Sequence, residues 1–231
     1  VVVAAGVAQA AGNDYEEVRE LSLESRGIDT LSVDNGSGSI DIVGVSNASE
    51  ISVTATVVVP GRNEDKVRER IEDDLRLTLR KESDTAVLVA YFEKSGWFKW
   101  NDEPSVSLEI RMPEQMHLVV DDGSGSIGID GVRGDIILDD GSGSIELADV
   151  GGQIEIDDGS GSITAERVGG DISVNDGSGS IRIRGVTGSV TVDDGSGSIN
   201  IRDVEKDLTI IDDGSGGLDF ANIAGRVRTA D

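Results

Sequence analysis

Cysteine is absent from this chain of 231 residues, and histidine occurs once, at His117. Without cysteine there can be no disulfide, no thiolate nucleophile, no zinc-thiolate site and no lipid-modified N-terminal cysteine. A single imidazole also excludes a histidine-rich metal site. Serine and aspartate are abundant, but nothing resembles the nucleophile elbow of a serine hydrolase, so we expect no enzyme activity.

Basic residues are scarce as well. The chain has 20 Lys and Arg against 45 Asp and Glu, a formal net charge of −25 and a pI near 4.2. Such a field repels nucleic acid and anionic lipid. We therefore expect no nucleic-acid partner, and we expect basic surfaces, cations or neutral polymers such as glycans instead.

Long hydrophobic runs are missing, because no stretch reaches the roughly 18 apolar residues of a membrane span. The first ten residues, VVVAAGVAQA, end in the small-x-small pattern Ala8-Gln9-Ala10, which is typical of the end of a secretory signal peptide. We interpret residues 1–10 as a signal-peptide remnant and expect export to the periplasm, the cell envelope or the outside of the cell. The alternative is an ordinary first β-strand at residues 1–3.

What the chain does have is an internal repeat. The string GSGS, with one GSGG variant at the end, begins at Gly36, Gly123, Gly141, Gly159, Gly177, Gly195 and Gly214. From Gly123 onward the spacings are 18, 18, 18, 18 and 19 residues. A fixed period of this kind is typical of solenoids.

Each repeat predicts two short strands. In residues 135–152, apolar side chains alternate at Ile136 and Leu138 and again at Ile145 and Leu147, between glycine-rich corners. One coil buries too little apolar surface to offset its conformational entropy, so the coils must stack with their strands in parallel. We predict an all-β fold, a right-handed parallel β-solenoid with about 18 residues per coil.

The repeat copies at Gly36 and Gly123 are 87 positions apart, and the stretch between them has another character. Alternation predicts strands at 51–59, 75–79, 86–92 and 106–112, and residues 63–74 predict a short amphipathic helix with Asn63 as N-cap. We interpret this stretch as an antiparallel insertion that covers the N-terminal edge of the solenoid, because an uncovered edge invites aggregation. The predicted organisation is a β-rich segment with one early repeat copy and the capping insertion at 11–112, then the tandem repeats at 113–231.

Residues 108–150 contain a strand ending at Met112-Pro113, followed by tandem units of strand, GSGS, strand and glycine-rich corner. In these marks the chain resembles a bacterial β-strand-repeat family of adhesin-like proteins, a domain of unknown function related to the head-GIN adhesin-like domains. The resemblance covers about residues 20–230. It implies a secreted or envelope-associated right-handed β-solenoid, and it brings no catalytic residues.

An acidic pair, once with asparagine, precedes each tandem GSG: Asp121-Asp122, Asp139-Asp140, Asp157-Asp158, Asn175-Asp176, Asp193-Asp194 and Asp212-Asp213. Stacked coils would put like charges about 4.8 Å apart, so we expect the ladder to face solvent or to hold cations. Because calcium prefers carboxylate and carbonyl oxygens, the candidate cation ligands are Asp122, Asp140, Asp158, Asp176, Asp194 and Asp213. Serine, however, takes the place of the ligand Asp of the toxin-type calcium roll. The alternative is that these carboxylates cap N–H groups of the turns without any cofactor.

Two serine files accompany the aspartates: Ser124, Ser142, Ser160, Ser178, Ser196 and Ser215, and Ser126, Ser144, Ser162, Ser180 and Ser198. Regular hydroxyls on a flat sheet could match a glycan or an ice lattice. The alternative is solvent-facing filler that keeps the strands soluble.

Aromatic residues make up only 3% of the chain, yet five lie within ten residues: Tyr91, Phe92, Trp97, Phe98 and Trp100. The flanking strands place Trp97, Phe98 and Trp100 on a loop or hairpin tip. There they suit a partner groove, a sugar face or a membrane interface, so these three are the candidate partner-binding residues. The alternative is that the loop folds back over the helix as a small core.

Two functions fit these patterns. The first is a non-catalytic, exported scaffold or adhesive module that binds an unknown surface, glycan or protein through its Asp/Ser face or its aromatic tip. The second is a calcium-loaded extracellular solenoid whose stability depends on bound cations.

Overall fold

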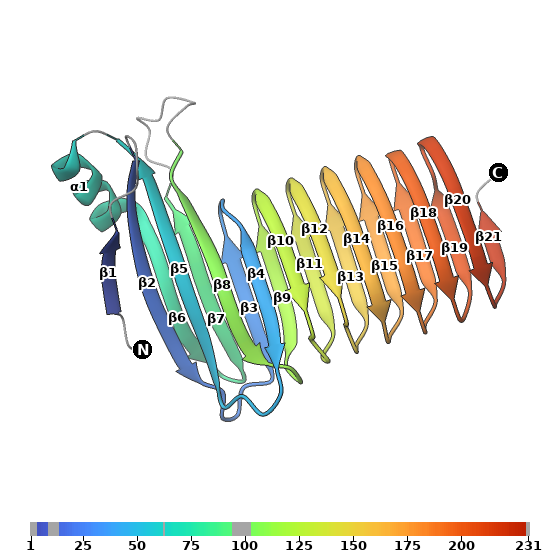
Figure 1. Ribbon diagram of the computed structural model, residues 1–231, viewed down its shortest axis with the longest axis horizontal. Helices are drawn as coiled ribbons and strands as arrows, with labels where there is room; N and C mark the ends of the chain where they lie inside the picture. Colours follow the sequence, from blue (N-terminus) through green and yellow to red (C-terminus); the bar gives the residue numbers. More distant parts are fainter. Residues whose placement is uncertain (1–3, 9–13, 62, 94–102, 230–231) are drawn as a thin grey trace.

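The computed structural model describes residues 4–8, 14–61, 63–93 and 103–229. Its strands form two sheets that enclose the core of an elongated molecule (Figure 1). Sheet A has 11 strands in the order β1-β2-β5-β8-β4-β10-β12-β14-β16-β18-β20. Sheet B has 10 strands in the order β21-β19-β17-β15-β13-β11-β9-β3-β7-β6.

The N-terminal elements precede the tandem repeats. They are β1 (Ala4–Ala8), β2 (Asp14–Glu24), β3 (Thr30–Asn35), β4 (Ile40–Val45), β5 (Glu50–Pro60), α1 (Glu64–Asp74), β6 (Leu75–Glu82), β7 (Thr85–Phe92) and β8 (Ser105–Pro113).

The tandem repeats supply the remaining strands. They are β9 (His117–Asp122), β10 (Gly125–Asp130), β11 (Ile136–Asp140), β12 (Gly143–Ala148), β13 (Ile154–Asp158), β14 (Gly161–Val168), β15 (Ile172–Asp176), β16 (Gly179–Val186), β17 (Val190–Asp194), β18 (Ser196–Val204), β19 (Leu208–Asp212), β20 (Ser215–Ile223) and β21 (Val227–Thr229).

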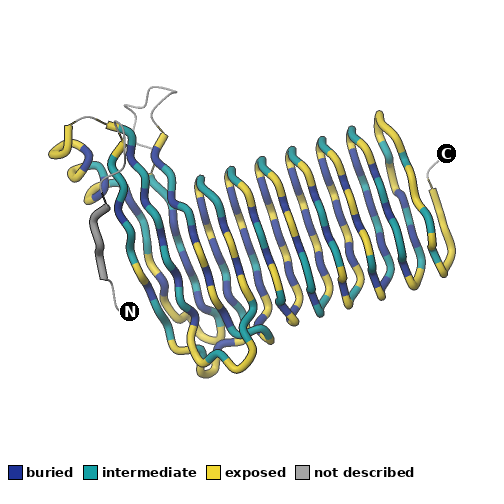
Figure 2. Tube along the Cα trace, in the orientation of Figure 1, coloured by how far each residue is buried: buried dark blue, intermediate teal, exposed yellow. Residues whose placement is uncertain are grey.

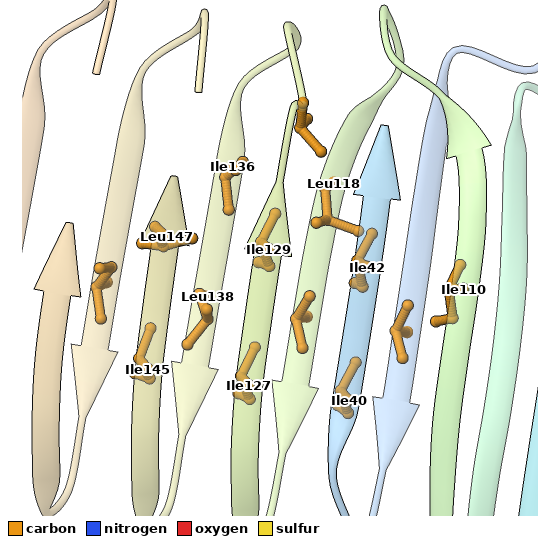
Figure 3. Close-up of a cluster of buried hydrophobic side chains, with 14 of the residues drawn as sticks. Ile40, Ile42, Ile110, Leu118, Ile127, Ile129, Ile136, Leu138, Ile145 and Leu147 are labelled. Carbon is orange, nitrogen blue, oxygen red and sulfur yellow. The ribbon is translucent and has the colours of Figure 1, made fainter. Parts of the chain in front are cut away.

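Each tandem repeat contributes one strand to each sheet, which confirms the predicted parallel β-solenoid with coils of about 18 residues. Equivalent repeat positions meet in register, so that one buried row reads Ile127, Ile145, Ile163, Ile181 and Ile199. Figure 3 shows such rows continuing from coil to coil between the sheets. Stacking therefore gives every coil the core that a single coil lacks.

The early repeat copy is far from the others in sequence but adjoins them in space. Strand β3 pairs in parallel with β9, and β4 pairs in parallel with β10. Ile40 therefore stands in the same row as Ile127. The intervening residues include β7 and β8, which lie on the opposite side of this coil from β9 and β10.

The capping insertion is antiparallel only in part. Strand β5 pairs antiparallel with β2 and β8, and β6 pairs antiparallel with β7. However, β7 and β8 pair in parallel with β3 and β4, so they extend the solenoid by another layer. The four predicted strands and the short helix are confirmed, and β5 and β6 make the antiparallel pairings, while β7 and β8 also join the parallel stack.

Helix α1 lies at the N-terminal end of the solenoid (Figure 1). Asn63 is its N-cap, since the Asn63 Oδ1 atom accepts a hydrogen bond of 3.1 Å from the Lys66 N–H. Val67 and Ile71 are buried in the hydrophobic core. The predicted helix and its cap are therefore confirmed.

The opposite end of the solenoid is open in the described part of the chain. Strand β20 pairs only with β18, and β21 pairs only with β19. The inward-facing Phe220 and Val227 remain 38% and 40% exposed, because no further coil covers them (Figure 2).

The segment interpreted as a signal-peptide remnant includes β1, which pairs antiparallel with β2. A strand at residues 4–8 agrees with the alternative interpretation of this segment as β-structure, while residues 1–3, where that strand was predicted, lie outside the described residues. Export remains a prediction. In the ranges that the structure describes, no helix is long and apolar enough to cross a membrane.

Candidate functional site

The acidic pairs form two parallel files that run across sheet B, at the C-terminal ends of its strands. This row of strand ends is called the sheet B edge below. We call outer file the residues Asp34, Asp121, Asp139, Asp157, Asn175 and Asp193, and inner file the residues Asn35, Asp122, Asp140, Asp158, Asp176 and Asp194. The parallel register aligns each member with its equivalent in the next coil. Neighbouring members therefore lie about 4.8 Å apart along the backbone.

The inner file is buried, so of the two expectations for the ladder, exposure to solvent or cation binding, exposure does not hold for this file. Its five aspartates are between 0% and 2% exposed. The sequence did carry the signal: Asp140 follows Ile136 and Leu138 at the same two-residue interval, and this parity turns its side chain toward the core. The charge of an aspartate therefore does not show whether its side chain points to the core or to solvent.

Each inner carboxylate from the third to the sixth position caps a turn. Oδ1 accepts the N–H of the serine two residues later, from Ser142 to Asp140 at 3.1 Å and from Ser160 to Asp158 at 3.1 Å. The same bond recurs at Asp176 and Asp194. These bonds agree with the turn-capping interpretation.

The second oxygen of each inner carboxylate has no such partner. Oδ2 of Asp122, Asp140, Asp158, Asp176 and Asp194 is buried without a hydrogen bond, and so is Oδ1 of Asn35. A buried polar atom without a partner is costly, and a buried charge more so.

Burial therefore favours the neutral form of these acids. Removal from water, and then repulsion by Asp122, raises the pKa of Asp140 to about 6. Burial likewise raises the pKa of Asp122, Asp158 and Asp176 to about 6 against an ordinary value of 3.8. The pKa of Asp194 is also raised, again mainly by burial.

The outer file has the opposite environment. Asp34, Asp121, Asp139 and Asp157 are exposed, and Asp193 is half-buried. No ion pair in the described ranges involves an outer-file carboxylate. Burial, then repulsion by Asp121, raises the pKa of Asp34.

Acidic side chains at the sheet A edge are neutralised instead by arginines of neighbouring coils. Arg167 donates two hydrogen bonds of 2.9 Å to the Asp149 carboxylate, and Arg184 lies 3.3 Å from Asp203. Arg167 holds the pKa of Asp149 below its ordinary value, and a hydrogen bond from Asn222, followed by that from Arg184, does the same for the pKa of Asp203. The outer file is therefore an acidic stripe without ion pairs in the described ranges, whereas Asp149 and Asp203 on sheet A form ion pairs with arginines.

The last predicted cation ligand, Asp213, falls outside the inner file. The spacing of 19 residues before Gly214 shifts the register, so that Asp193 pairs with Asp212. Asp212 Oδ1 accepts the Gly214 N–H at 2.9 Å, and Asp213 is half-buried. The regular files end at the coil of Asp194.

The serine files flank the glycine corners. Ser126, Ser144, Ser162, Ser180 and Ser198 are exposed and in register, while Ser124, Ser142, Ser160, Ser178 and Ser196 are half-buried. The first set presents one hydroxyl per coil to solvent.

The aromatic tip is not described. Trp97, Phe98 and Trp100 lie outside the described residues, so their predicted role as partner contacts stays a prediction. Tyr91 and Phe92 are half-buried at the end of β7.

His117 has a structural contact. Its Nδ1 accepts the Asp135 N–H at 3.0 Å, and Asp135 in turn accepts the Gln153 N–H at 2.9 Å. This links successive coils. Among the described residues, no group of three or more His, Asp and Glu is arranged to hold a metal ion.

A family model fits this geometry. The model described as Toastrack DUF4097 matches residues 28–227, which is most of the chain. The chain belongs to the Toastrack DUF4097 family. This confirms the resemblance to an adhesin-like repeat domain of unknown function.

Solved structures similar to this Toastrack chain have low sequence identity. A "putative adhesin" from Bacteroides fragilis is 10% identical with a TM-score of 0.47, covering 92% of this chain and 97% of that one. A "putative lipid binding protein" from Parabacteroides distasonis is 19% identical with a TM-score of 0.48, covering 94% and 97%. At these values the likeness carries no argument about function. No curated protein matches the Toastrack chain.

Proposed function

We propose that this Toastrack domain is a non-catalytic, exported scaffold or adhesive module that binds a basic or neutral surface through its Asp/Ser face. The observation that carries the proposal is the outer file: its aspartates, four exposed and one half-buried, recur in register on successive coils, interrupted once by Asn175, and none has a cationic partner in the described ranges. A repetitive charged face can contact a partner at many weak points at once, which gives avidity without a pocket.

The contrast between the two edges supports a binding role for the stripe. Arginines of neighbouring coils neutralise Asp149 and Asp203 at the sheet A edge. The outer file at the sheet B edge lacks such arginines, although they would remove its repulsion. A basic partner would supply the missing positive charge and be attracted over a distance set by the salt concentration.

The exposed serine file adds neutral hydrogen-bonding groups at the same corner. Ser126, Ser144 and their equivalents each present a hydroxyl that both donates and accepts. Such groups suit a glycan hydroxyl as well as a peptide. The tip with Trp97, Phe98 and Trp100 is proposed as a second contact for a surface, glycan or protein.

The test compares two variants of equal charge. In the first, Asp121, Asp139, Asp157 and Asp193 of the outer file become Asn; in the second, the sheet A residues Asp41, Asp130, Glu146 and Glu166 become Asn or Gln. We expect adsorption to a polylysine-coated surface to fall strongly in the first variant and only slightly in the second. Equal losses would mean that net charge alone acts, and would contradict a specific face.

The calcium-loaded solenoid is the second candidate. The unpartnered Oδ2 atoms of the inner file favour it, since they are oxygens without a donor. Its test is a melting curve with millimolar calcium, with chelator and with sodium at equal ionic strength. Stabilisation specific to calcium and reversed by chelation would support it.

A further inference from the structure

The first member of the inner file, Asn35, is bonded to its equivalent in the next coil. The Asn35 Nδ2 donates a hydrogen bond of 2.9 Å to Oδ1 of Asp122, its partner in the next coil. The outer file repeats this contact, where the Asn175 Nδ2 donates to Oδ1 of Asp157 at 3.2 Å. Wherever an amide occupies either file, it therefore bridges two coils.

Asp122, Asp140, Asp158, Asp176 and Asp194 form the rest of the inner file. An ionised carboxylate can only accept hydrogen bonds, so two neighbouring carboxylates repel where an amide would donate. Oδ1 of Asp140 already accepts the turn N–H, and Oδ2 is buried without a donor. Each pair of neighbouring carboxylates therefore lacks a hydrogen-bond donor.

The surroundings of the file supply no compensating positive charge. Its charged neighbours are carboxylates: Asp121, Asp139, Asp157 and Asp193 of the outer file, and Asp212 and Asp213 beyond Asp194. Asn175 and Asn35 are the uncharged neighbours. No ion pair in the described parts of the chain reaches an inner-file carboxylate.

We infer that the inner file is a proton-binding site, in which carboxylic acids donate O–H···O hydrogen bonds from coil to coil along the core. Each proton comes from solvent and forms an O–H bond at one Oδ2 atom. This O–H group donates a hydrogen bond to a carboxylate oxygen of the adjacent coil. The negative charge of the file falls by one for each proton bound. Proton uptake therefore replaces repulsion with a hydrogen bond equivalent to that of Asn35.

A proton fits the file better than a metal ion. Calcium takes six to eight oxygens, whereas each inner contact offers few, and the described residues contain no group of three ligands arranged for a metal. A shared proton needs only two oxygens. The raised pKa of about 6 at Asp122, Asp140, Asp158 and Asp176 agrees with uptake in mildly acidic solution.

Because neighbouring members share protons, the file should titrate as a unit over a wide pH range. A half-protonated file already allows alternate members to donate to their ionised neighbours. This inference is independent of the proposed binding role of the outer file.

The test is a pH titration of the whole protein labelled with carbon-13 at the aspartate side-chain carboxyl, followed by NMR from about pH 8 to about pH 4. We expect a first set of carboxyl signals, from the inner file, to shift near pH 6. Asp140→Asn and Asp158→Asn should each remove one signal from the first set, and Asp139→Asn and Asp157→Asn should not. The unsubstituted protein gives the decisive result if a variant fails to fold.

Two outcomes would overturn the inference. One is that every aspartate signal shifts near pH 4. The other is that millimolar calcium, but not sodium at equal ionic strength, abolishes the shift near pH 6, which would make the file a metal site. Neither outcome bears on adsorption by the outer file, so the two proposals fail separately.

Discussion

Asp139 and Asp140 are adjacent in sequence and identical in chemistry, yet the structure gives them opposite environments. Asp139 is exposed on the outer file, whereas Asp140 is 1% exposed and lies in the core. Period-two alternation separates them, since Asp140 has the parity of Ile136 and Leu138. The comparison teaches that in a β-solenoid register, and not residue type, decides whether a carboxylate meets water.

The strongest way to break this comparison is to change the register. Deleting residues 157–174 removes one repeat of 18 residues and joins Ile156 to Asn175, which replaces Asp157 on the outer file. We expect a shorter, folded protein. Deleting only residues 157–169, or 13 residues, brings core rows out of alignment and should unfold the C-terminal coils. Circular dichroism and melting curves measure both, and equal tolerance would contradict the account.

A smaller effect should follow from filling the corner that joins the inner file to sheet A. Gly143 has φ +153°, and an added Cβ would lie 1.6 Å from the Gly125 carbonyl oxygen. Gly143→Ala should therefore cost about 3 kcal/mol or more, through backbone strain and displacement of the next coil.

The matched control lies in the open terminal coil. A Cβ at Gly217 would meet nothing within 4 Å, so Gly217→Ala should leave the free energy of unfolding nearly unchanged. Urea titrations of both variants measure the difference. Similar losses of stability would show that the coils do not stack as closely as described.

Much of this architecture could be predicted from the sequence because the repeat is regular. The 18-residue spacing and the alternation predicted coils and core rows, and the residues around Asn63 predicted the helix and its cap. Each coil contacts only its neighbouring coils and repeats their pattern of inward side chains, so the strands assigned to one repeat also apply to the next.

The errors have physical causes. Like-charge repulsion predicted that the ladder faces solvent or holds cations, but it did not separate the two files, although Asp140 follows the alternation of its strand. The pairing of β7 and β8 with β3 and β4 was not predicted, because these partners are distant in sequence. Asp213 was grouped with the other aspartates from its place before the GSG string, but the 19-residue spacing shifts the register there.

The comparison can be sharpened by pH. The pKa of Asp158 is raised from 3.8 to about 6, so the folded state binds its proton more tightly than the unfolded state. The stability linked to this group is therefore present below about pH 3.8 and is lost as pH rises through about 6. The loss is up to about 3 kcal/mol, at about 1.4 kcal/mol per pKa unit.

Asp158→Asn should remove that loss, because an amide can donate to the next carboxylate as Asn35 does. We expect its melting temperature to exceed that of the unsubstituted protein at about pH 7.5 and to match it at about pH 4.5. Asp157→Asn, in the exposed outer file, is the control. Because it keeps Asp158, its melting temperature should change with pH much as that of the unsubstituted protein does. A destabilised Asp158→Asn protein at neutral pH would show that the carboxylate is needed as an anion.

The smallest effect is expected at the paired edge of sheet A. Arg167 and Asp149 are both exposed, and such pairs contribute little because water and salt screen them. Arg167→Ala should leave the melting temperature nearly unchanged at physiological salt. A large loss would mean that the inter-coil ion pairs hold the stack together.

The absence of cysteine allows the most direct test of the two environments. Asp157→Cys and Asp158→Cys each introduce a single thiol at adjacent positions, and the native proteins are treated with a maleimide after circular dichroism confirms that they fold. We predict that the thiol at position 157 reacts with the maleimide as fast as in the unfolded chain. The thiol at position 158 should react at least about a hundredfold more slowly, because the reagent reaches it only when the structure opens locally. Similar rates at both positions would contradict the claim that register separates an exposed outer file from a buried inner file.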